Sequence, residues 1–228
     1  MATTWRHAPD PMVGKLYNPG ARQVFLGIYN NLQLTSGDSP RQSILVCAAN
    51  PHEGASMVAL GVALAAAEQN AEPVLLMDGN FHYPHVCEAF GQMELFGLGD
   101  LMSGKLDQAS AIRPTTVPAM HVLGAGVVQP NHLQNLENPK FRDLLQGLKS
   151  LYKLIVVDGP AVNFYPESVV YASQVDRVLL VVYAGQTRSQ VVQTALSRLT
   201  QSGCDDKKIE LVLNRRTFPI PKWLYKKL

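Results

Sequence analysis

Apolar runs of strand length alternate with helical segments along most of this 228-residue chain. The runs are apolar throughout, which is typical of strands in a parallel sheet that is covered on both faces. The predicted strands are 43–48, 74–77, 120–123, 154–157, 177–183 and 209–213. The main predicted helices are 22–34, 54–70, 140–151, 166–173 and 187–201. This pattern predicts an α/β fold with a doubly wound, mostly parallel sheet and helices on both faces.

The chain divides into three regions by composition. Residues 1–17 contain two prolines and no clear periodicity, so we expect an irregular N-terminal arm. Residues 18–214 hold all the predicted strands and form one domain. Residues 215–228 form a basic and aromatic tail, in which Pro219 and Pro221 prevent a continuous helix.

Charge and cysteine content restrict the class of protein. The net charge of +2 is too small for the concentrated basic field of a nucleic-acid-binding domain, so we expect no nucleic-acid partner. The three cysteines are widely spaced and odd in number, which favours reduced thiols in the cytoplasm. The sequence has no signal peptide and no apolar run of about eighteen residues, so we expect a cytoplasmic protein.

The positive charge is concentrated at the C-terminus. The last fourteen residues carry five of the twenty lysines and arginines and no acid, together with aromatic side chains that include Trp223 and Tyr225. Basic and aromatic side chains together favour the interface of an anionic membrane, so 215–228 is a candidate contact with the membrane surface or with a membrane partner. The alternative is that the tail folds back over the sheet edge or a helix of its own domain.

The loop after the first predicted strand resembles a phosphate-binding loop. The P-loop pattern is G-x-x-x-x-G-K-[ST], and here Gly54 and Ser56 are kept, whereas Ala49 and Ala55 replace the first glycine and the lysine. Backbone N–H groups at the start of the following helix favour an anion without any side chain. An ordinary turn between a strand and a helix is the alternative.

Two further strands end in acids. Asp78 and Asp158 each follow an apolar run, and carboxylates at these positions can hold magnesium or cap the next turn. His82, His85 and Cys87 lie close together in sequence, but Pro84 interrupts their spacing and no fourth ligand is evident, so we do not expect a metal site there.

Taken in order, several segments resemble the cytoplasmic domain of bacterial tyrosine kinases of the polysaccharide-export type, within the ParA/MinD-like P-loop ATPases. The resemblance covers about 18–214 and is carried by "NPGARQVFLGIYNNLQL", "SILVCAANPHEGAS", "VLLMDGNFHYP", "FGLGDLMSG", "HVLGAGVVQPN", "LIVVDGPAV", "VDRVLLVVYAGQTR" and "VLNRR". It implies a P-loop NTPase-like fold and a site for ATP or ADP with magnesium.

The resemblance also implies roles for matching residues. The loop 49–56 would wrap the phosphates, Ser56 and Asp158 would serve magnesium, and Asp78 would belong to the second acidic motif. Asn214 would lie near the adenine base.

The chain departs from the family pattern in four places. Where the family has P-G-E-G-K-[ST]-T, this chain has Pro51, His52, Glu53, Gly54, Ala55, Ser56 and Met57. The second aspartate of the D-x-D motif is Asn80. The E-x-x-R-x-x-R motif used in ring assembly appears as Gln23, Leu26 and Tyr29, and the tyrosine-rich tail is absent.

These departures predict a protein that has lost turnover, because the lysine meets the charge that develops in phosphoryl transfer. Asp78, Asn80 and Asp158 would then be vestiges of a catalytic site, and the kinase-type ring would not close. The leading hypothesis is a regulatory or scaffolding partner of an inner-membrane polysaccharide co-polymerase in exopolysaccharide or capsule export, peripheral to the inner membrane. The alternatives are an active ATPase or tyrosine autokinase of the same family and a ParA/MinD-like positioning ATPase.

Overall fold

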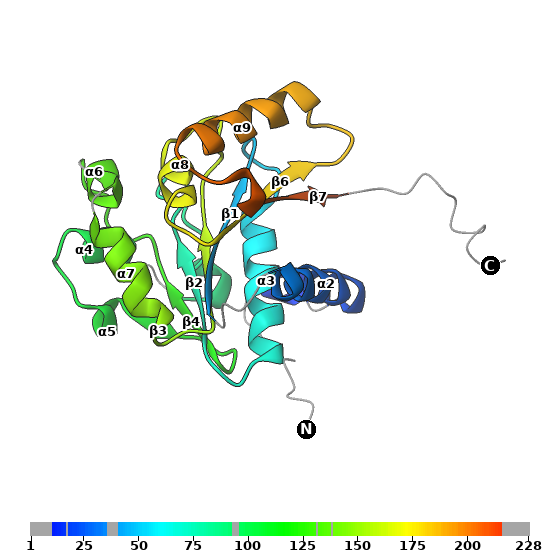
Figure 1. The fold of residues 1–228 in the computed structure, drawn as a ribbon. Helices are drawn as coiled ribbons and strands as arrows, with labels where there is room; N and C mark the ends of the chain where they lie inside the picture. The colour runs from blue at the N-terminus through cyan, green and yellow to red at the C-terminus, as the bar shows by residue number, and fades with distance from the viewer. Residues whose placement is uncertain are drawn as a thin grey trace.

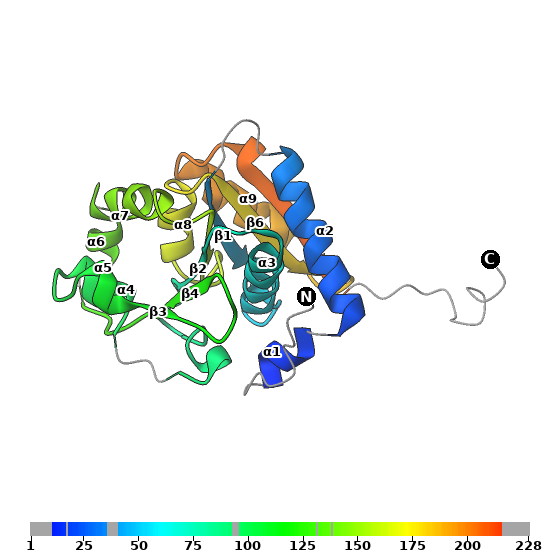
Figure 2. The same ribbon diagram turned by 90° about the horizontal axis from the view of Figure 1, so that it is seen from below.

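The fold is a seven-stranded sheet between two layers of helices (Figures 1 and 2). The computed structural model describes residues 11–16, 18–35, 41–92, 96–130, 132–137 and 139–215. The strands, in chain order, are β1 (Gln42–Ala48), β2 (Val74–Asp78), β3 (Ile112–Pro114), β4 (Met120–Leu123), β5 (Leu154–Asp158), β6 (Arg177–Tyr183) and β7 (Ile209–Asn214). Their order across the sheet is β3-β4-β2-β5-β1-β6-β7, and every pairing is parallel except β3 with β4.

Helices cover both faces of the sheet. One face carries α1 (Pro11–Leu16), α2 (Pro19–Thr35) and α3 (Ala55–Gln69). The other face carries α4 (Leu98–Met102), α5 (Gln108–Ala111), α6 (His132–Glu137), α7 (Pro139–Lys149), α8 (Glu167–Ala172) and α9 (Ser189–Gln201). Two short 3₁₀ helices are η1 (Glu88–Phe90) and η2 (Asp206–Lys208). The predicted doubly wound α/β fold is therefore confirmed.

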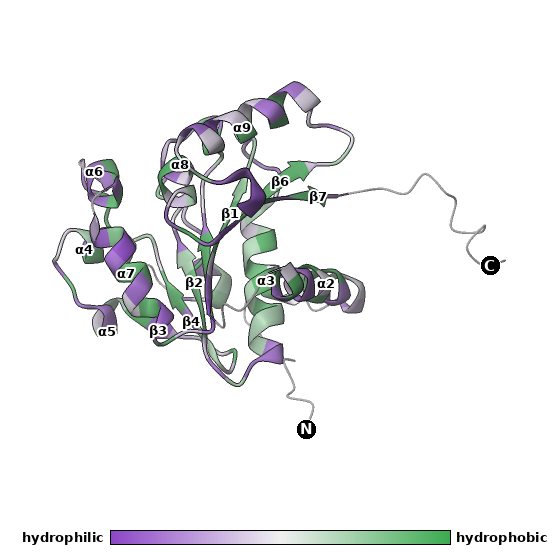
Figure 3. Ribbon diagram, viewed as in Figure 1, coloured by the Kyte–Doolittle hydropathy of each residue, from purple (hydrophilic) through white to green (hydrophobic). Residues whose placement is uncertain are grey.

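α3 is the central helix of the first layer and is apolar on all sides (Figure 3). A helix of this kind must be covered all round, and α2 lies across the side of α3 that faces away from the sheet. The Phe25 ring of α2 packs directly on Gly61, where an added Cβ would lie 2.5 Å from the ring. An ion pair between Arg22 and Glu68, 2.9 Å long, joins the same two helices at the surface.

α2 also contains the positions that match the ring-assembly motif. Gln23 is exposed, Leu26 is half-buried against the core, and Tyr29 is buried, with its hydroxyl accepting a hydrogen bond from Asn70 Nδ2 at 2.8 Å. Leu26 and Tyr29 therefore pack on their own domain. The absence of a kinase-type ring stays a prediction, which light scattering of the purified protein tests.

The structure corrects the predicted boundaries in several places. Part of the predicted irregular arm is regular, because α1 forms there and buries Val13 and Leu16 against the core. The antiparallel edge strand β3 and the short helices α4, α5 and α6 were not predicted, since each is too short to give a periodic pattern. In the tail 215–228, only Arg215 lies within the described residues. Among the described helices, none combines the length and the apolar character that crossing a bilayer requires.

The contact between Phe25 and Gly61 gives a stability prediction. We expect Gly61→Ala to lower the free energy of unfolding by about 1–3 kcal/mol, because the new methyl group must displace a packed ring. Urea denaturation measures the effect.

Gly147 is the matched control. It lies on the exposed side of α7, and an added Cβ would be 3.8 Å from the nearest atom, Gln108 Nε2. We expect Gly147→Ala to be neutral or to stabilise by up to about 1 kcal/mol through helix propensity. Equal effects of the two substitutions would contradict the packing argument.

Candidate functional site

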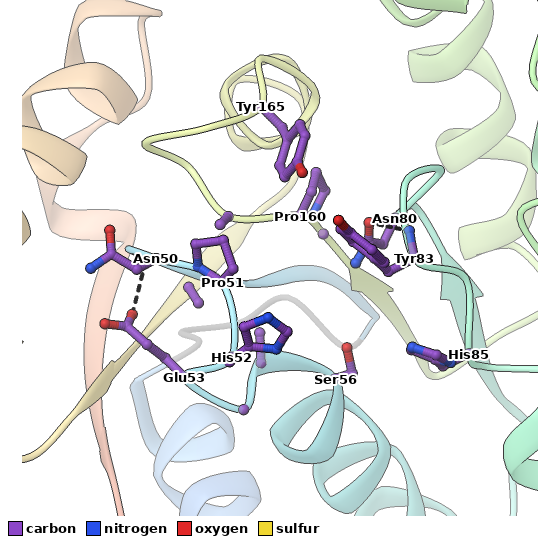
Figure 4. A pocket seen from close by; sticks show the side chains of 15 residues that line it. Asn50, Pro51, His52, Glu53, Ser56, Asn80, Tyr83, His85, Pro160 and Tyr165 are labelled. Atoms are coloured by element: carbon purple, nitrogen blue, oxygen red, sulfur yellow. Dashed lines mark hydrogen bonds between the residues drawn. The ribbon is translucent and has the colours of Figure 1, made fainter.

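A cleft lies at the carboxyl ends of β1, β2 and β5 (Figure 4), where a doubly wound sheet binds its ligands. Three loops form its walls: the loop after β1, the loop after β2 and the loop after β5. The described residues that line it are Ala48, Asn50, Pro51, His52, Glu53, Gly54, Ala55, Ser56, Asn80, Tyr83, His85, Gly159, Pro160, Ala161 and Tyr165. The structure therefore brings together most of the predicted loop 49–56 and Asn80.

The loop after β1 is held in shape by Glu53 and Asn214. The Glu53 carboxylate is buried and accepts hydrogen bonds from the Asn50 backbone N–H, at 2.9 Å, and from the Thr187 hydroxyl. Asn214 Nδ2 donates to the Glu53 carbonyl oxygen at 2.8 Å. Gly54 has φ 95°, and an added Cβ would lie 2.3 Å from Asn214 Nδ2, so this position requires glycine. Asn214, on β7, thus supports the loop after β1, and it is not among the residues that line the cleft.

The first turn of α3 presents Ala55 and Ser56 to the cleft. Met57, which was predicted to belong to the site, packs against the core instead. Among the described residues that line the cleft, none is a lysine or an arginine. The cleft therefore offers an anion the backbone N–H groups and dipole of α3, the Ser56 hydroxyl and two histidines, but no permanent positive charge.

Asp78 and Asp158 lie side by side at the ends of β2 and β5, where they are register partners. Both are buried. Asp78 accepts backbone N–H groups from Asn80 at 3.0 Å, His85 at 2.8 Å and Val86 at 3.0 Å, so it anchors the loop after β2.

Asp158 differs from Asp78 in its hydrogen bonds and has a raised pKa. Burial and the nearby charge of Asp78 raise its pKa well above the ordinary value, against a hydrogen bond with Ser56 that lowers it. Its Oδ1 atom is buried without a hydrogen-bond partner among the described residues. Asp158 is therefore the acid of this pair with a carboxyl oxygen that has no partner among the described residues, although it is 1% exposed and does not line the cleft.

Aromatic side chains form the wall of the cleft opposite α3. Tyr83 and Tyr165 come from the loops after β2 and β5, and desolvation, a hydrogen bond with Tyr83 and the nearby charge of Glu167 raise the pKa of Tyr165. Asn80 Oδ1 accepts the Tyr83 backbone N–H at 3.2 Å and so shapes this wall. Sequence reasoning missed both tyrosines, since only the position of their loops after strands pointed to them.

The histidines and the cysteine that follow β2 have separate partners. His82 contacts Glu167, His85 contacts Glu88, and Cys87 receives a hydrogen bond from Arg113. Over the described part of the chain, no three His, Cys, Asp or Glu side chains are grouped so that they could hold a metal ion.

Comparison with known proteins identifies relatives along most of the chain, although no protein-family model matches. The tyrosine-protein kinase CpsD of Streptococcus pneumoniae is 26% identical over 89% of this chain and 88% of its own length. The tyrosine-protein kinase YwqD of Bacillus subtilis is 25% identical, covering 82% of this chain and 78% of its own. The tyrosine-protein kinase Wzc of Salmonella typhimurium is 26% identical over 84% of this chain, which spans only 26% of Wzc.

Solved structures give the same result. The VpsO kinase domain is 28% identical, with a TM-score of 0.78, over 91% of this chain and all of its own. The kinase domain of the Escherichia coli tyrosine kinase ETK, at 22% identity, has a TM-score of 0.82 over 97% of this chain and 88% of its own. The cell division ATPase MinD of Pyrococcus furiosus, at 20% identity, has a TM-score of 0.64 over 83% of this chain and 79% of its own. The resemblance to bacterial tyrosine kinases is therefore confirmed, and the likeness to MinD shows a shared fold.

The raised pKa of Asp158 gives a prediction with a definite sign. Above about pH 4 the unfolded chain has released this proton while the folded protein retains it, so wild-type stability falls as the pH rises toward the folded-state pKa. We expect Asp158→Asn to be more stable than wild type at pH 7.5 by roughly 1–3 kcal/mol, because a neutral amide avoids the cost of keeping a buried carboxyl protonated above its unfolded-state pKa. The difference should shrink at pH 4, as measured by urea denaturation.

Asp176 is a control with the opposite sign. Partial burial opposes its ionisation, but hydrogen bonds from Lys149 and Ser43 outweigh burial and lower its pKa. Asp176→Asn should therefore destabilise the protein at pH 7.5 and lose this effect on acidification. An Asp158→Asn protein less stable than wild type at pH 7.5 would refute the account of the acid pair.

Proposed function

We propose that this chain is a catalytically deficient relative of bacterial tyrosine kinases, with a nucleotide site that binds without turning over. The observation that carries the proposal is Ala55, which lines the cleft at the first residue of α3, where the P-loop pattern has lysine. Phosphoryl transfer depends on preorganised positive charge around the transferred group, and alanine supplies none. Asn80 in place of the second acid of the D-x-D motif supports the same conclusion.

Nucleotide binding in this proposal rests on the backbone. The N–H groups at the start of α3 would take phosphate oxygens, and the Glu53 and Asn214 contacts keep the loop in the conformation that exposes them. Losing one charge-assisted contact with a lysine costs roughly 1.5–3 kcal/mol, which weakens binding without abolishing it.

Two residues at or beside the cleft, Ser56 and Asp158, have the chemistry of magnesium ligands. The orphaned Asp158 Oδ1 and the adjacent Ser56 hydroxyl are oxygen ligands of the kind magnesium prefers, and these two residues would hold it. Bound magnesium would neutralise phosphate charge. Asp78 is less suited to this role, since its carboxylate oxygens already accept three backbone N–H groups.

The kind of relative supports the proposal of a role beside a membrane protein. The chain corresponds to about a quarter of Wzc, so it resembles one module of a larger kinase. We infer that it acts as a regulatory or scaffolding partner for the cytosolic segment of an inner-membrane polysaccharide co-polymerase. The higher TM-scores with kinase domains than with MinD support likeness to the kinases over a positioning ATPase.

Turnover and binding are tested by restoring the lysine. We expect wild-type protein to show no ATP hydrolysis above background and no autophosphorylation. Ala55→Lys should bind ATP with magnesium about ten- to a hundredfold more tightly than wild type in isothermal titration, because it regains the charge-assisted contact. Ala55→Met, of similar length but uncharged, should not. Wild-type turnover that requires magnesium and disappears in Asp158→Ala would instead support the active autokinase.

The basic tail supplies the test of the partner. Its five basic side chains would each contribute roughly 1 kcal/mol near an anionic leaflet. We expect truncation after Arg216 to leave the Tm unchanged while binding to anionic vesicles, or to the co-polymerase segment, is lost. Lys226→Gln with Lys227→Gln, which keeps the aromatic residues, should weaken vesicle binding partially. A large fall in Tm with binding retained would show that the tail covers its own domain.

A further inference from the structure

A group of titratable side chains outside the phosphate loop joins three distant segments. Glu167, at the start of α8, is 1% exposed, and its Oε1 atom lies 2.9 Å from His82 Nε2 and 2.9 Å from His132 Nε2. His82 belongs to the loop after β2, and His132 is the first residue of α6. Glu167 Oε2 is buried with no hydrogen-bond partner among the described residues. We call these three residues the Glu167 cluster.

The cluster adjoins the wall of the cleft. The His82 ring stacks on Tyr165, with centroids 3.8 Å apart and an interplanar angle of 23°. Tyr165 lines the cleft (Figure 4). On the other side, Phe81 meets the His132 ring edge-on, with centroids 5.4 Å apart. Contacts made by the cluster therefore fix the position of one cleft-lining aromatic ring.

The hydrogen bonds determine how many protons the cluster holds. His132 Nε2 faces the Glu167 carboxylate and His132 Nδ1 faces the Gln129 carbonyl oxygen at 3.1 Å, and both of these oxygens are acceptors. A neutral imidazole has one N–H, so with Glu167 ionised His132 satisfies both contacts only as the doubly protonated imidazolium. The other titratable groups beside Glu167 are the Tyr165 and Tyr171 hydroxyls, whose pKa values are raised by burial first and also by the charge of Glu167.

We propose that His82, His132 and Glu167 form a proton-dependent clamp that holds the loop after β2 against the starts of α6 and α8 and so fixes the tyrosine wall of the cleft. With His132 doubly protonated, one buried carboxylate meets one cation and two N–H donors. When His132 loses a proton, one of its two contacts loses its donor, the carboxylate loses its counter-charge, and the clamp weakens. Histidine is the residue type whose charge changes near neutrality, so pH 6 and pH 8 are the conditions to compare. The proposal is independent of nucleotide binding.

The first test measures protons directly in wild-type protein. Side-chain ¹⁵N NMR should show both ring nitrogens of His132 protonated at pH 6 and only one at pH 8. A His132 ring that holds a single proton at both pH values, in folded protein, would overturn the proposal. This measurement needs no substitution and stands even if a variant fails to fold.

The second test is the pH dependence of Tm. His132→Gln keeps one donor but cannot ionise, so its Tm should fall between pH 6 and pH 8 by about 2–4 °C less than that of wild type, the shift one such interaction gives in a domain of this size. His121→Gln is the matched control, because His121 is a half-buried histidine on β4 whose Nδ1 meets the Tyr152 hydroxyl at 2.8 Å. It should keep the wild-type pH dependence. A His132→Gln protein with the wild-type slope would refute the clamp.

Discussion

The parallel register of β2 and β5 places two buried carboxyl groups, Asp78 and Asp158, side by side. The construction of the cleft depends on how the protein limits the repulsion between these two groups. Two adjacent ionised acids in a buried site repel each other strongly. The protein separates their roles, because Asp78 receives three backbone N–H groups whereas the pKa of Asp158 rises through burial and the charge of Asp78. The hydrogen bonds from these N–H groups hold the loop after β2 against Asp78, and Tyr83 and His85 of this loop line the cleft.

The alanine at position 55 and the protonation of Asp158 are linked. A lysine at position 55 would place a cation near the acid pair and would favour the ionised form of Asp158. With alanine there, and with no lysine or arginine among the described cleft residues, burial and Asp78 act on Asp158 without that compensation. Alanine at position 55, which we propose prevents phosphoryl transfer, would therefore also leave Asp158 less ionised and less suited to hold magnesium near neutral pH.

Much of the fold could be predicted from the sequence because its main strands are continuous apolar runs. β4 and β6 have the predicted bounds, and β2 and β5 extend one residue further to include the acids that end them. α1 and β3 were not predicted, because each is short and depends on tertiary contacts. The phosphate loop was found from local spacing, whereas Tyr165 and the Glu167 cluster were not, since their partners are 35 to 85 residues apart in sequence. Local patterns cannot report such contacts.

The loop after β2 is held by two different carboxylates, one that binds its backbone and one that binds a side chain. Asp78 binds backbone N–H groups of the loop, and Glu167 binds the His82 side chain. Asp78 lies at the end of a strand, which fixes it in place, whereas Glu167 lies at the start of a six-residue helix and depends on its histidine partners for charge balance. The Asp78 contacts are therefore the permanent support of the cleft wall, and the Glu167 contacts are the support that protons can change. A ligand or partner that contacts Tyr83 or Tyr165 would therefore act on a wall that is held by Asp78 and, in our proposal, also by Glu167.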